Sequence, residues 1–394
     1  RPLGADSADR TAAPVKTLPH ALATGALLAL LATPAAGAVR AILAFGDSIT
    51  AGVGDTRPEP DRGYPARLAA LLAEAGVAAE VRNLGVPGET TAEGLARLPA
   101  ALAAGGNLLL LMEGTNDVSH DVSPETIAYN LREMGRLASQ RGIEPIFATL
   151  IPRGPAAPTD PRNLQTERVA WELRDLAYRD GAGLVDAYAV FTRTREVFGR
   201  LYADPYHPNA EGYDLLAKAF AEMLLGIDTV APVAAFVRPA DGESGVPPTS
   251  ELTFYLYDHL SGVDAAHATM LIDGEPVAAT VSSSVPRRLA FTYRPATPLA
   301  NVVRLGYRAR DLATPPNEIE ETLATFVVAG TELLTGDLDR DGRVDGRDLV
   351  AFAVLFGSNA GDGRYDPRGD LDRNGRIDGL DLALLAANFG RSAF

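Results

Sequence analysis

Residues 41–50 read Ala-Ile-Leu-Ala-Phe-Gly-Asp-Ser-Ile-Thr, an apolar run that stops at a glycine and continues into two polar residues. Such a run, followed by Gly-Asp-Ser, predicts a short buried β-strand that ends in a tight turn. Ser48 comes directly after this strand. In a doubly wound sheet, ligands bind outside the carboxyl ends of the strands. The stretch therefore predicts the first strand of an α/β domain, although a lone serine in such a turn also suits a helix cap.

The residues that follow alternate between short apolar runs and longer amphipathic ones, up to about residue 227. Further strands are predicted at 79–83, 107–112, 143–150 and 184–185. Helical stretches are predicted at 64–75, 124–140, 165–179 and 210–225. Strands that alternate with helices are typical of a parallel sheet covered on both faces. The sequence therefore predicts an α/β domain over residues 39–227.

Composition restricts the classes of protein to which the chain can belong. Its 394 residues exceed what one hydrophobic core usually serves, which favours two or three domains. With 46% hydrophobic and 22% charged residues, the chain has the composition of a folded protein. A net charge of -15 argues against a nucleic-acid partner. Because cysteine is absent, disulfides, thiolate metal sites and a cysteine nucleophile are excluded.

The first 38 residues have the pattern of a secretory signal. Arg10 and Lys16 precede an apolar run at 21–31, and small residues fill 34–38. This order predicts cleavage after Ala38, and the apolar run is too short to span a bilayer. We therefore expect an extracellular or cell-surface protein with no membrane span once the signal is removed. The alternative interpretation is a buried N-terminal helix.

Polar residues and a glycine follow the ends of the other predicted strands. Gly85 follows the second strand, Asn116 the third, and Asp204 with His207 the last. Because the carboxyl ends of parallel strands meet at one edge, these residues are expected to converge on Ser48. A serine nucleophile needs a base, a group that orients the base, and donors for an oxyanion.

The base follows from the distribution of the histidines. Three of the five lie outside the α/β segment: His20, His259 and His267. His120 lies in a loop after Asn116 and is the minor candidate. His207 is the main candidate, because Asp204 precedes it by three residues and can accept its Nδ1 proton.

Three groups are candidates for the oxyanion hole. The backbone N–H groups of Ser48 and Gly85 can point toward a substrate oxygen, and the Asn116 side-chain amide can add a third donor. A glycine at 85 leaves no side chain between the backbone and the substrate, although it also suits a simple turn at the end of a strand.

Together these segments resemble the SGNH, or GDSL-like, hydrolase family. The matching motifs are Gly-Asp-Ser-Ile-Thr at 46–50, Asn-Leu-Gly-Val-Pro-Gly-Glu-Thr at 83–90, Gly-Thr-Asn-Asp at 114–117 and Asp-Pro-Tyr-His-Pro-Asn at 204–209. The resemblance implies a flavodoxin-like α/β/α sandwich with a parallel sheet. It also implies a serine esterase that acts on esters of lipids, acetylated sugars or aryl alcohols, with no cofactor for catalysis.

Residues 228–330 lose the helical period. Apolar and aromatic residues recur at period two around residues 252–256, 289–293 and 303–307, between turns rich in Gly, Pro and Asp. This pattern predicts an all-β sandwich, and the segments 261–264 and 310–317 resemble bacterial immunoglobulin-like modules. A spacer is favoured over a carbohydrate-binding role, since the fold alone carries no function.

Residues 331–394 contain an internal repeat, because 336–357 align with 369–390 at an offset of 33 residues. Carboxylates and one amide recur at the spacing of a calcium loop, with Gly342 and Gly375 at the sharp turn. The candidate ligands of two Ca²⁺ ions are Asp337, Asp339, Asp341, Arg343 (through its carbonyl), Asp345, Asp348, Asp370, Asp372, Asn374, Arg376 (through its carbonyl), Asp378 and Asp381.

The repeat resembles a type I dockerin, a small helical domain in which one helix leaves each calcium loop. That resemblance implies a cohesin-bearing scaffold as partner, but the frequent Ser-Thr pair is replaced by Gly346 and Arg347, then Gly379 and Leu380. A calcium-stabilised module without a partner is the alternative. The predicted function is that of a secreted serine esterase that deacetylates a carbohydrate. The alternatives are a lysophospholipase or thioesterase, or a non-catalytic adhesion or scaffold-binding protein.

Overall fold

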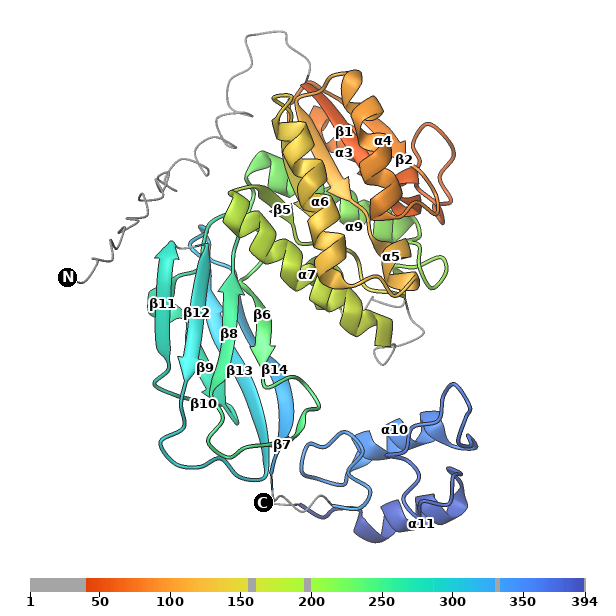
Figure 1. Cartoon of the computed structure of the whole chain (residues 1–394), viewed down its shortest axis with the longest axis vertical. Helices are drawn as coiled ribbons and strands as arrows, with labels where there is room; N and C mark the ends of the chain where they lie inside the picture. Colours follow the sequence, from red (N-terminus) through yellow and green to blue (C-terminus); the bar gives the residue numbers. More distant parts are fainter. Residues whose placement is uncertain (1–39, 155–160, 195–199, 286, 330–333, 393–394) are drawn as a thin grey trace, which may run out of the picture.

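The computed structural model describes residues 40–154, 161–194, 200–285, 287–329 and 334–392. The predicted signal segment 1–38 lies outside the described residues. Figure 1 shows an α/β domain, a β domain of two sheets and a small helical module, in chain order. Within the described ranges, no helix is long and apolar enough to cross a membrane.

The α/β domain is built on a parallel sheet with the strand order β2-β1-β3-β4-β5. The strands are β1 (Arg40–Gly46), β2 (Ala79–Gly85), β3 (Leu108–Met112), β4 (Glu144–Ala148) and β5 (Gly183–Val185). This 2-1-3-4-5 order is that of flavodoxin-like proteins, whose ligands lie at the switch point between strands 1 and 3. The predicted α/β fold class is confirmed.

Helices cover both faces of this sheet. They are α2 (Ser48–Ala51), α3 (Gly63–Glu74), α4 (Thr91–Ala103), α5 (Thr115–Ser119), α6 (Pro124–Ser139), α7 (Pro161–Asp180), α8 (Ala187–Arg193) and α9 (Ala210–Leu225). One apolar cluster joins the sheet to α3 and α9, and a second joins it to α4, α6 and α7. In Figure 1, α6 and α7 lie in front of the sheet and α9 behind it.

The β domain consists of two sheets that enclose a common core. One has the order β10-β9-β13-β14-β7, and the other β11-β12-β8-β6. The strands are β6 (Val233–Arg238), β7 (Ser244–Val246), β8 (Leu252–Tyr257), β9 (Thr269–Ile272), β10 (Glu275–Pro276), β11 (Thr280–Val285), β12 (Arg288–Tyr293), β13 (Val302–Arg310) and β14 (Glu318–Val328). The period-two residues of β8, such as Leu252, Phe254 and Leu256, are buried.

Helix α7 attaches the β domain to the α/β domain. Trp171 packs against the apolar core of the β domain, with its ring 5.8 Å from that of Phe236. Asp175 accepts hydrogen bonds from the Tyr257 hydroxyl at 2.9 Å and from Arg288 at 3.2 Å. The β domain is therefore fixed against the α/β domain by both apolar and polar contacts.

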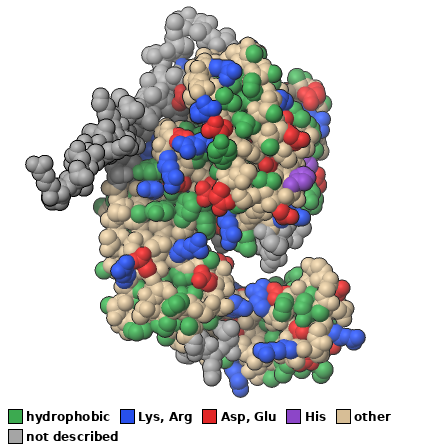
Figure 2. Space-filling view, viewed as in Figure 1, with side chains coloured by type: hydrophobic (Ala, Val, Ile, Leu, Met, Phe, Trp, Pro, Cys, Tyr) green, Lys and Arg blue, Asp and Glu red, His purple; other side chains and the backbone are tan. Residues whose placement is uncertain are grey.

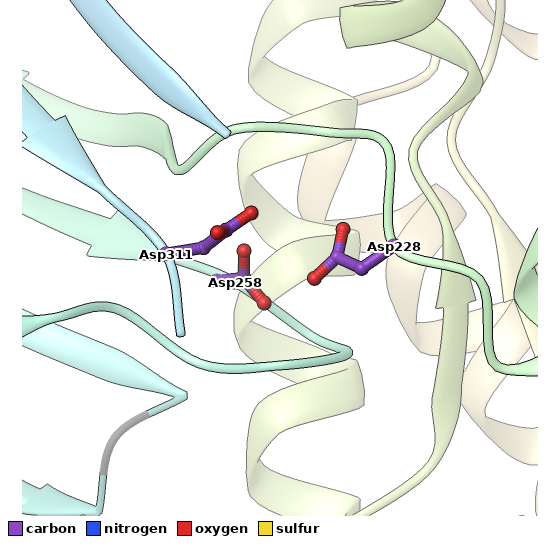
Figure 3. A group of neighbouring side chains, drawn as sticks. All are labelled: Asp228, Asp258 and Asp311. Atoms are coloured by element: carbon purple, nitrogen blue, oxygen red, sulfur yellow. The ribbon is translucent and has the colours of Figure 1, made fainter. Parts of the chain in front are cut away.

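Three carboxylates meet where the chain passes into the β domain (Figure 3). Asp228 lies in the connection, Asp258 directly follows β8 and Asp311 directly follows β13. Carboxylate oxygens from all three lie within 4.8 Å of one another. Each also accepts hydrogen bonds from backbone N–H groups of the surrounding loops. Burial, followed by the charge of Asp228, raises the pKa of Asp258 to about 7.

The C-terminal module contains α10 (Gly346–Leu355) and α11 (Gly379–Asn388) around a small core. The repeat places Val344 and Ile377 at matching buried positions, as it does Phe352 and Leu385. In Figure 2 this module is a separate lobe. On the face shown there, acidic and basic side chains are interspersed.

Candidate active site

Ser48 lies at the junction between β1 and α2. It is the first residue of α2 and is 8% exposed. Asp47 caps the helix, because its carboxylate accepts the Ile49 N–H at 2.9 Å. The Ser48 side chain is therefore held at the carboxyl end of β1, where the sequence predicted a site.

His207 and Asp204 form a row with Ser48. His207 Nε2 lies 2.9 Å from Ser48 Oγ, and His207 Nδ1 lies 2.7 Å from Asp204 Oδ2. The other Asp204 oxygen accepts the backbone N–H groups of Tyr206 and His207, at 2.8 and 2.9 Å. When His207 keeps its proton on Nδ1 and donates that N–H to Asp204, it presents the free Nε2 lone pair to the serine hydroxyl.

The pKa of Asp204 lies below its ordinary value. Burial alone would raise this pKa, but the hydrogen bond from the His207 ring and those from the Tyr206 and His207 backbone outweigh it. An ionised Asp204 can stabilise the positive charge that His207 carries as an imidazolium. His120, the minor candidate for the base, instead directs its Nδ1 at the Asn116 carbonyl, 2.7 Å away in its own helical turn.

The candidate oxyanion donors differ in their availability. Ser48 is in the first turn of α2, where N–H groups have no acceptor within the helix. Asn116 Nδ2 donates to the Glu89 carbonyl at 2.8 Å, which leaves its second amide hydrogen for a substrate oxygen. The Gly85 N–H donates to Asn83 Oδ1 at 3.0 Å. Gly85 can therefore join the site only if this bond to an exposed side chain is exchanged.

Gly85 has a second relation to the nucleophile. A Cβ atom at this position would lie 2.7 Å from the Thr50 carbonyl carbon and 2.8 Å from Ala51 Cα, both in α2. Its closest contact would be the Ala51 backbone nitrogen. Because the backbone of α2 cannot give way as a side chain could, glycine is required for the close approach of β2 to the helix that carries Ser48.

Several residues near the site were not identified from the sequence. Arg153 donates to the Thr115 carbonyl at 3.2 Å and to Ser119 Oγ at 2.8 Å, and its guanidinium lies 5.1 Å from the centre of the Tyr206 ring. It thus joins the Asn116 loop to the His207 loop. No local pattern marks this arginine, since the two segments it joins are distant from it in the sequence.

A buried acidic group beneath the nucleophile was also missed. Asp47 and Glu113 are almost fully buried, at 1% and 0% exposure. Burial is the main cause that raises the pKa of Asp47 to about 6, and the Ile49 N–H and the charge of His207 partly offset it. Asp47 lies within the Gly-Asp-Ser-Ile-Thr motif and Glu113 directly precedes Gly-Thr-Asn-Asp, and that position was the available signal.

The two predicted calcium loops place their carboxylates together. Oxygens of Asp337, Asp339 and Asp341 lie within 4.8 Å of one another, as do those of the second-loop residues Asp370, Asp372 and Asp381. Burial, then the charge of Asp348 and the other loop carboxylates, raises the pKa of Asp337 to about 7. Crowded carboxylate oxygens are the donor set that Ca²⁺ prefers.

The remaining predicted ligands shape the loops. In a calcium loop counted from Asp337 or Asp370 as position 1, Asp348 and Asp381 stand at position 12 and accept backbone N–H groups at the start of their own loops. At position 9, Asp345 and Asp378 cap α10 and α11. At position 7, the N–H groups of Arg343 and Arg376 donate to Asp341 and Asn374, respectively. The residues present therefore fit a pair of calcium loops.

Comparison with known proteins gives two family matches. Residues 44–215 match the GDSL-like Lipase/Acylhydrolase family, and residues 335–390 match the Dockerin type I domain. The β domain between them is outside both matches.

Individual relatives cover parts of the chain. The esterase TesA of Pseudomonas aeruginosa is 37% identical over 125 residues, which are 31% of this chain and 60% of that protein. An arylesterase of Vibrio mimicus is 35% identical over 102 residues, 26% of this chain and 50% of that protein. The chain thus spans about half of the length of the curated relatives it matches.

Solved structures are similar to part of the chain. The acetylxylan esterase Axe2 of Geobacillus stearothermophilus is 23% identical, with 48% of this chain and 95% of that chain covered and a TM-score of 0.42. A G-D-S-L family protein of Veillonella parvula is 23% identical, with 46% and 96% covered and a TM-score of 0.41. From its two family matches, the chain contains a GDSL-like lipase/acylhydrolase domain and a type I dockerin domain.

Proposed function

We propose that the chain is a serine esterase that hydrolyses carboxylic esters through an acyl-enzyme. The observation that supports it most is the row of Ser48, His207 and Asp204, with contacts of 2.9 and 2.7 Å. His207 takes the hydroxyl proton as Ser48 Oγ attacks the ester carbonyl, and Asp204 stabilises the resulting imidazolium. His207 then gives the proton to the leaving alcohol, and water releases the acyl group by the reverse steps.

The negative oxygen of the tetrahedral intermediate needs donors on the opposite side of the carbonyl carbon. In the proposed reaction these are the Ser48 N–H and the second Asn116 amide hydrogen, joined by the Gly85 N–H once it leaves Asn83. Removal of one such donor typically lowers kcat by about 10²- to 10³-fold. The nucleophile, the base and the donors come from different strand ends, so the sheet edge fixes their relative positions.

For the substrate, we propose an acetylated carbohydrate. The leaving alcohol receives its proton from His207 Nε2, so it must lie over the His207 loop. That side is open, because the Asp204 side chain is 43% exposed and the adjacent Tyr206 is 41% exposed. An exposed ring beside an open proton donor can accommodate a bulky alcohol such as a sugar chain. The dockerin match also suits a chain that is delivered to a polymer by a scaffold.

The test compares wild type with S48A on p-nitrophenyl esters from acetyl to palmitoyl and on acetylated xylan. We expect turnover that falls with acyl length, release of acetate from xylan, and loss of activity in S48A. Preference for long chains would favour a lysophospholipase or thioesterase. Equal rates for wild type and S48A would refute the esterase and leave a binding or adhesion role.

For the C-terminal module, we propose two bound Ca²⁺ ions and a cohesin-bearing scaffold as partner, with an exported chain. The paired carboxylate clusters support the ions. Exposed apolar residues on α10 and α11, among them Val350, Val354 and Leu380, support a protein partner. Calorimetric titration with Ca²⁺ should give two sites, and a calcium-dependent complex with a cohesin would identify the partner.

A further inference from the structure

Glu113 is a buried carboxyl group that the proposed reaction does not use. It directly follows β3, three residues before Asn116, and its exposed fraction is 0%. Neither of its side-chain oxygens accepts a hydrogen bond from an N–H or O–H group of the described residues. An ionised carboxylate in such a place would lose its hydration without any compensating donor, which is strongly unfavourable.

The groups that face Glu113 make ionisation harder still. They are Asp47 at the start of α2, Glu89 in the loop before α4, and Asp117 in α5. The Glu89 carboxylate is itself paired with Arg97, which donates hydrogen bonds of 2.7 and 2.5 Å to its two oxygens. Burial first, then the neighbouring Glu89 carboxylate and the charges of Asp47 and Asp117, raise the pKa of Glu113 to about 10.

A neutral carboxyl group has a property that a carboxylate lacks, because it can donate a hydrogen bond. Resting on the esterase proposed above, we infer that Glu113 is a positioning residue: its protonated carboxyl group donates to the Glu89 carboxylate and so holds the Glu89 segment against β3. The Glu89 carbonyl is the acceptor that fixes Asn116 Nδ2, at 2.8 Å. One proton would thereby set the orientation of an oxyanion donor.

The packing around Glu113 supports a designated place for this carboxyl group. Gly94 of α4 faces it so closely that a Cβ atom there would lie 2.7 Å from Glu113 Oε1 and 2.8 Å from its carboxyl carbon. Thr90 and Glu93 form a capping box at the start of the same helix, which fixes the helix end that follows Glu89. The carboxyl group therefore has little room to turn away from Glu89.

The test uses E113Q and E113L as a matched pair. Gln is neutral at every pH and keeps an N–H donor for Glu89, whereas Leu has a similar volume and no donor. We expect kcat of E113Q within about threefold of wild type, and kcat of E113L lower by about 10- to 100-fold with KM little changed, as for a mispositioned catalytic group. Equal losses in both variants would overturn the inference, since they would indicate packing alone.

The pH profile provides a readout that a packing role would not change. The functional form carries the proton, so wild type should lose kcat as the pH rises through about 10, and E113Q should lack this loss. Folding raises the pKa of Glu113 from 4.5 to about 10, so between these pH values the folded protein binds one proton more than the unfolded chain. The free energy of unfolding of wild type should therefore fall as the pH rises through this range, and more steeply than that of E113Q. Identical profiles in kcat and in unfolding midpoint would overturn the inference.

Infrared spectroscopy tests the proton without any substrate. At pH 7 the difference spectrum of wild type minus E113Q should contain the carbonyl band of a protonated carboxyl group, and this band should disappear at high pH. Absence of the band would overturn the inference even for an active enzyme. Presence of the band in a protein without esterase turnover would refute the proposed function and retain the neutral Glu113. Neither outcome depends on whether E113L folds.

Discussion

Replacement of Gly85 by alanine tests whether the approach of β2 to α2 positions the nucleophile. The new Cβ atom would lie 2.7 Å from the Thr50 carbonyl carbon, against an ordinary contact distance of at least 3.4 Å. To restore that distance, the α2 backbone with Ser48 must move by at least about 0.7 Å, because backbone atoms have no rotamer to change. The Ser48 Oγ to His207 Nε2 contact, now 2.9 Å, would lengthen accordingly.

The expected loss follows from this displacement. A shift of about 1 Å in a reacting group costs on the order of 10²-fold in rate, so G85A should lower kcat/KM by about 10- to 100-fold. Overpacking should also lower the free energy of unfolding by about 1–3 kcal/mol. The assay is steady-state hydrolysis of p-nitrophenyl acetate, combined with urea denaturation.

Gly88, three residues further along the chain, provides the matched control. It has φ +83°, and a Cβ atom there would meet nothing within 4 Å. G88A should therefore lose about 1–2 kcal/mol of stability through left-handed strain but keep its activity. If G85A and G88A retain the same kcat/KM at similar stability, the close approach at Gly85 does not position Ser48 and the reasoning is refuted.

Four further changes have defined outcomes. Asp204→Asn should lower kcat by about 10²- to 10⁴-fold with KM little affected, because His207 loses its orienting carboxylate; steady-state kinetics would contradict this if kcat were unchanged. Gly94→Ala would stabilise an ordinary helix by up to about 1 kcal/mol, but here it should destabilise the protein, and less so when Glu113 is also replaced by alanine. If the effects of the two substitutions simply add in urea denaturation, position 94 does not contact the Glu113 carboxyl group. Trp171→Ala should lower the free energy of unfolding by less than the about 3–5 kcal/mol expected for a fully buried tryptophan. It should also separate the unfolding transitions of the α/β and β domains in calorimetry, and a single unchanged transition would count against their coupling. Chelation of Ca²⁺, or Asp339→Ala, should lower the melting temperature of the C-terminal module and leave kcat on a small ester unchanged, and a fall in kcat would show that the module acts on the active site.

The parts of the fold that could be predicted are those whose signal is local. Strands β1 and β3 are uninterrupted apolar runs, and the repeat places the calcium loops at fixed spacing. Helix α4 was not predicted, because it contains Gly94 and Pro99, which normally disfavour helix. The structure explains Gly94 by its contact with the Glu113 carboxyl group, a tertiary constraint that outweighs propensity.

The candidate site shows the same division. The convergence of Ser48 and His207 followed from strand ends in a parallel sheet, without knowledge of any distance. The hydrogen bond between the Gly85 N–H and Asn83 could not be predicted, because an Asn side chain competes for nearby backbone groups in ways that depend on the turn. The burial of Glu113 was equally hidden, since an acid next to a polar motif would ordinarily be taken as solvated.

The contact made by Trp171 also bears on how such chains are assembled during evolution. This residue belongs to a helix of the α/β domain, yet it packs against the core of the β domain. Nearby, Arg174 is 1% exposed, pairs with Asp186 at 2.7 Å and donates to the Ala234 carbonyl at 3.3 Å, across the junction. Recombination between the α/β and β domains would expose Trp171 and leave the buried Arg174 charge without its carbonyl partner. Shuffling should therefore transmit the α/β and β domains as one inherited cassette, and the dockerin as a separately exchangeable tail.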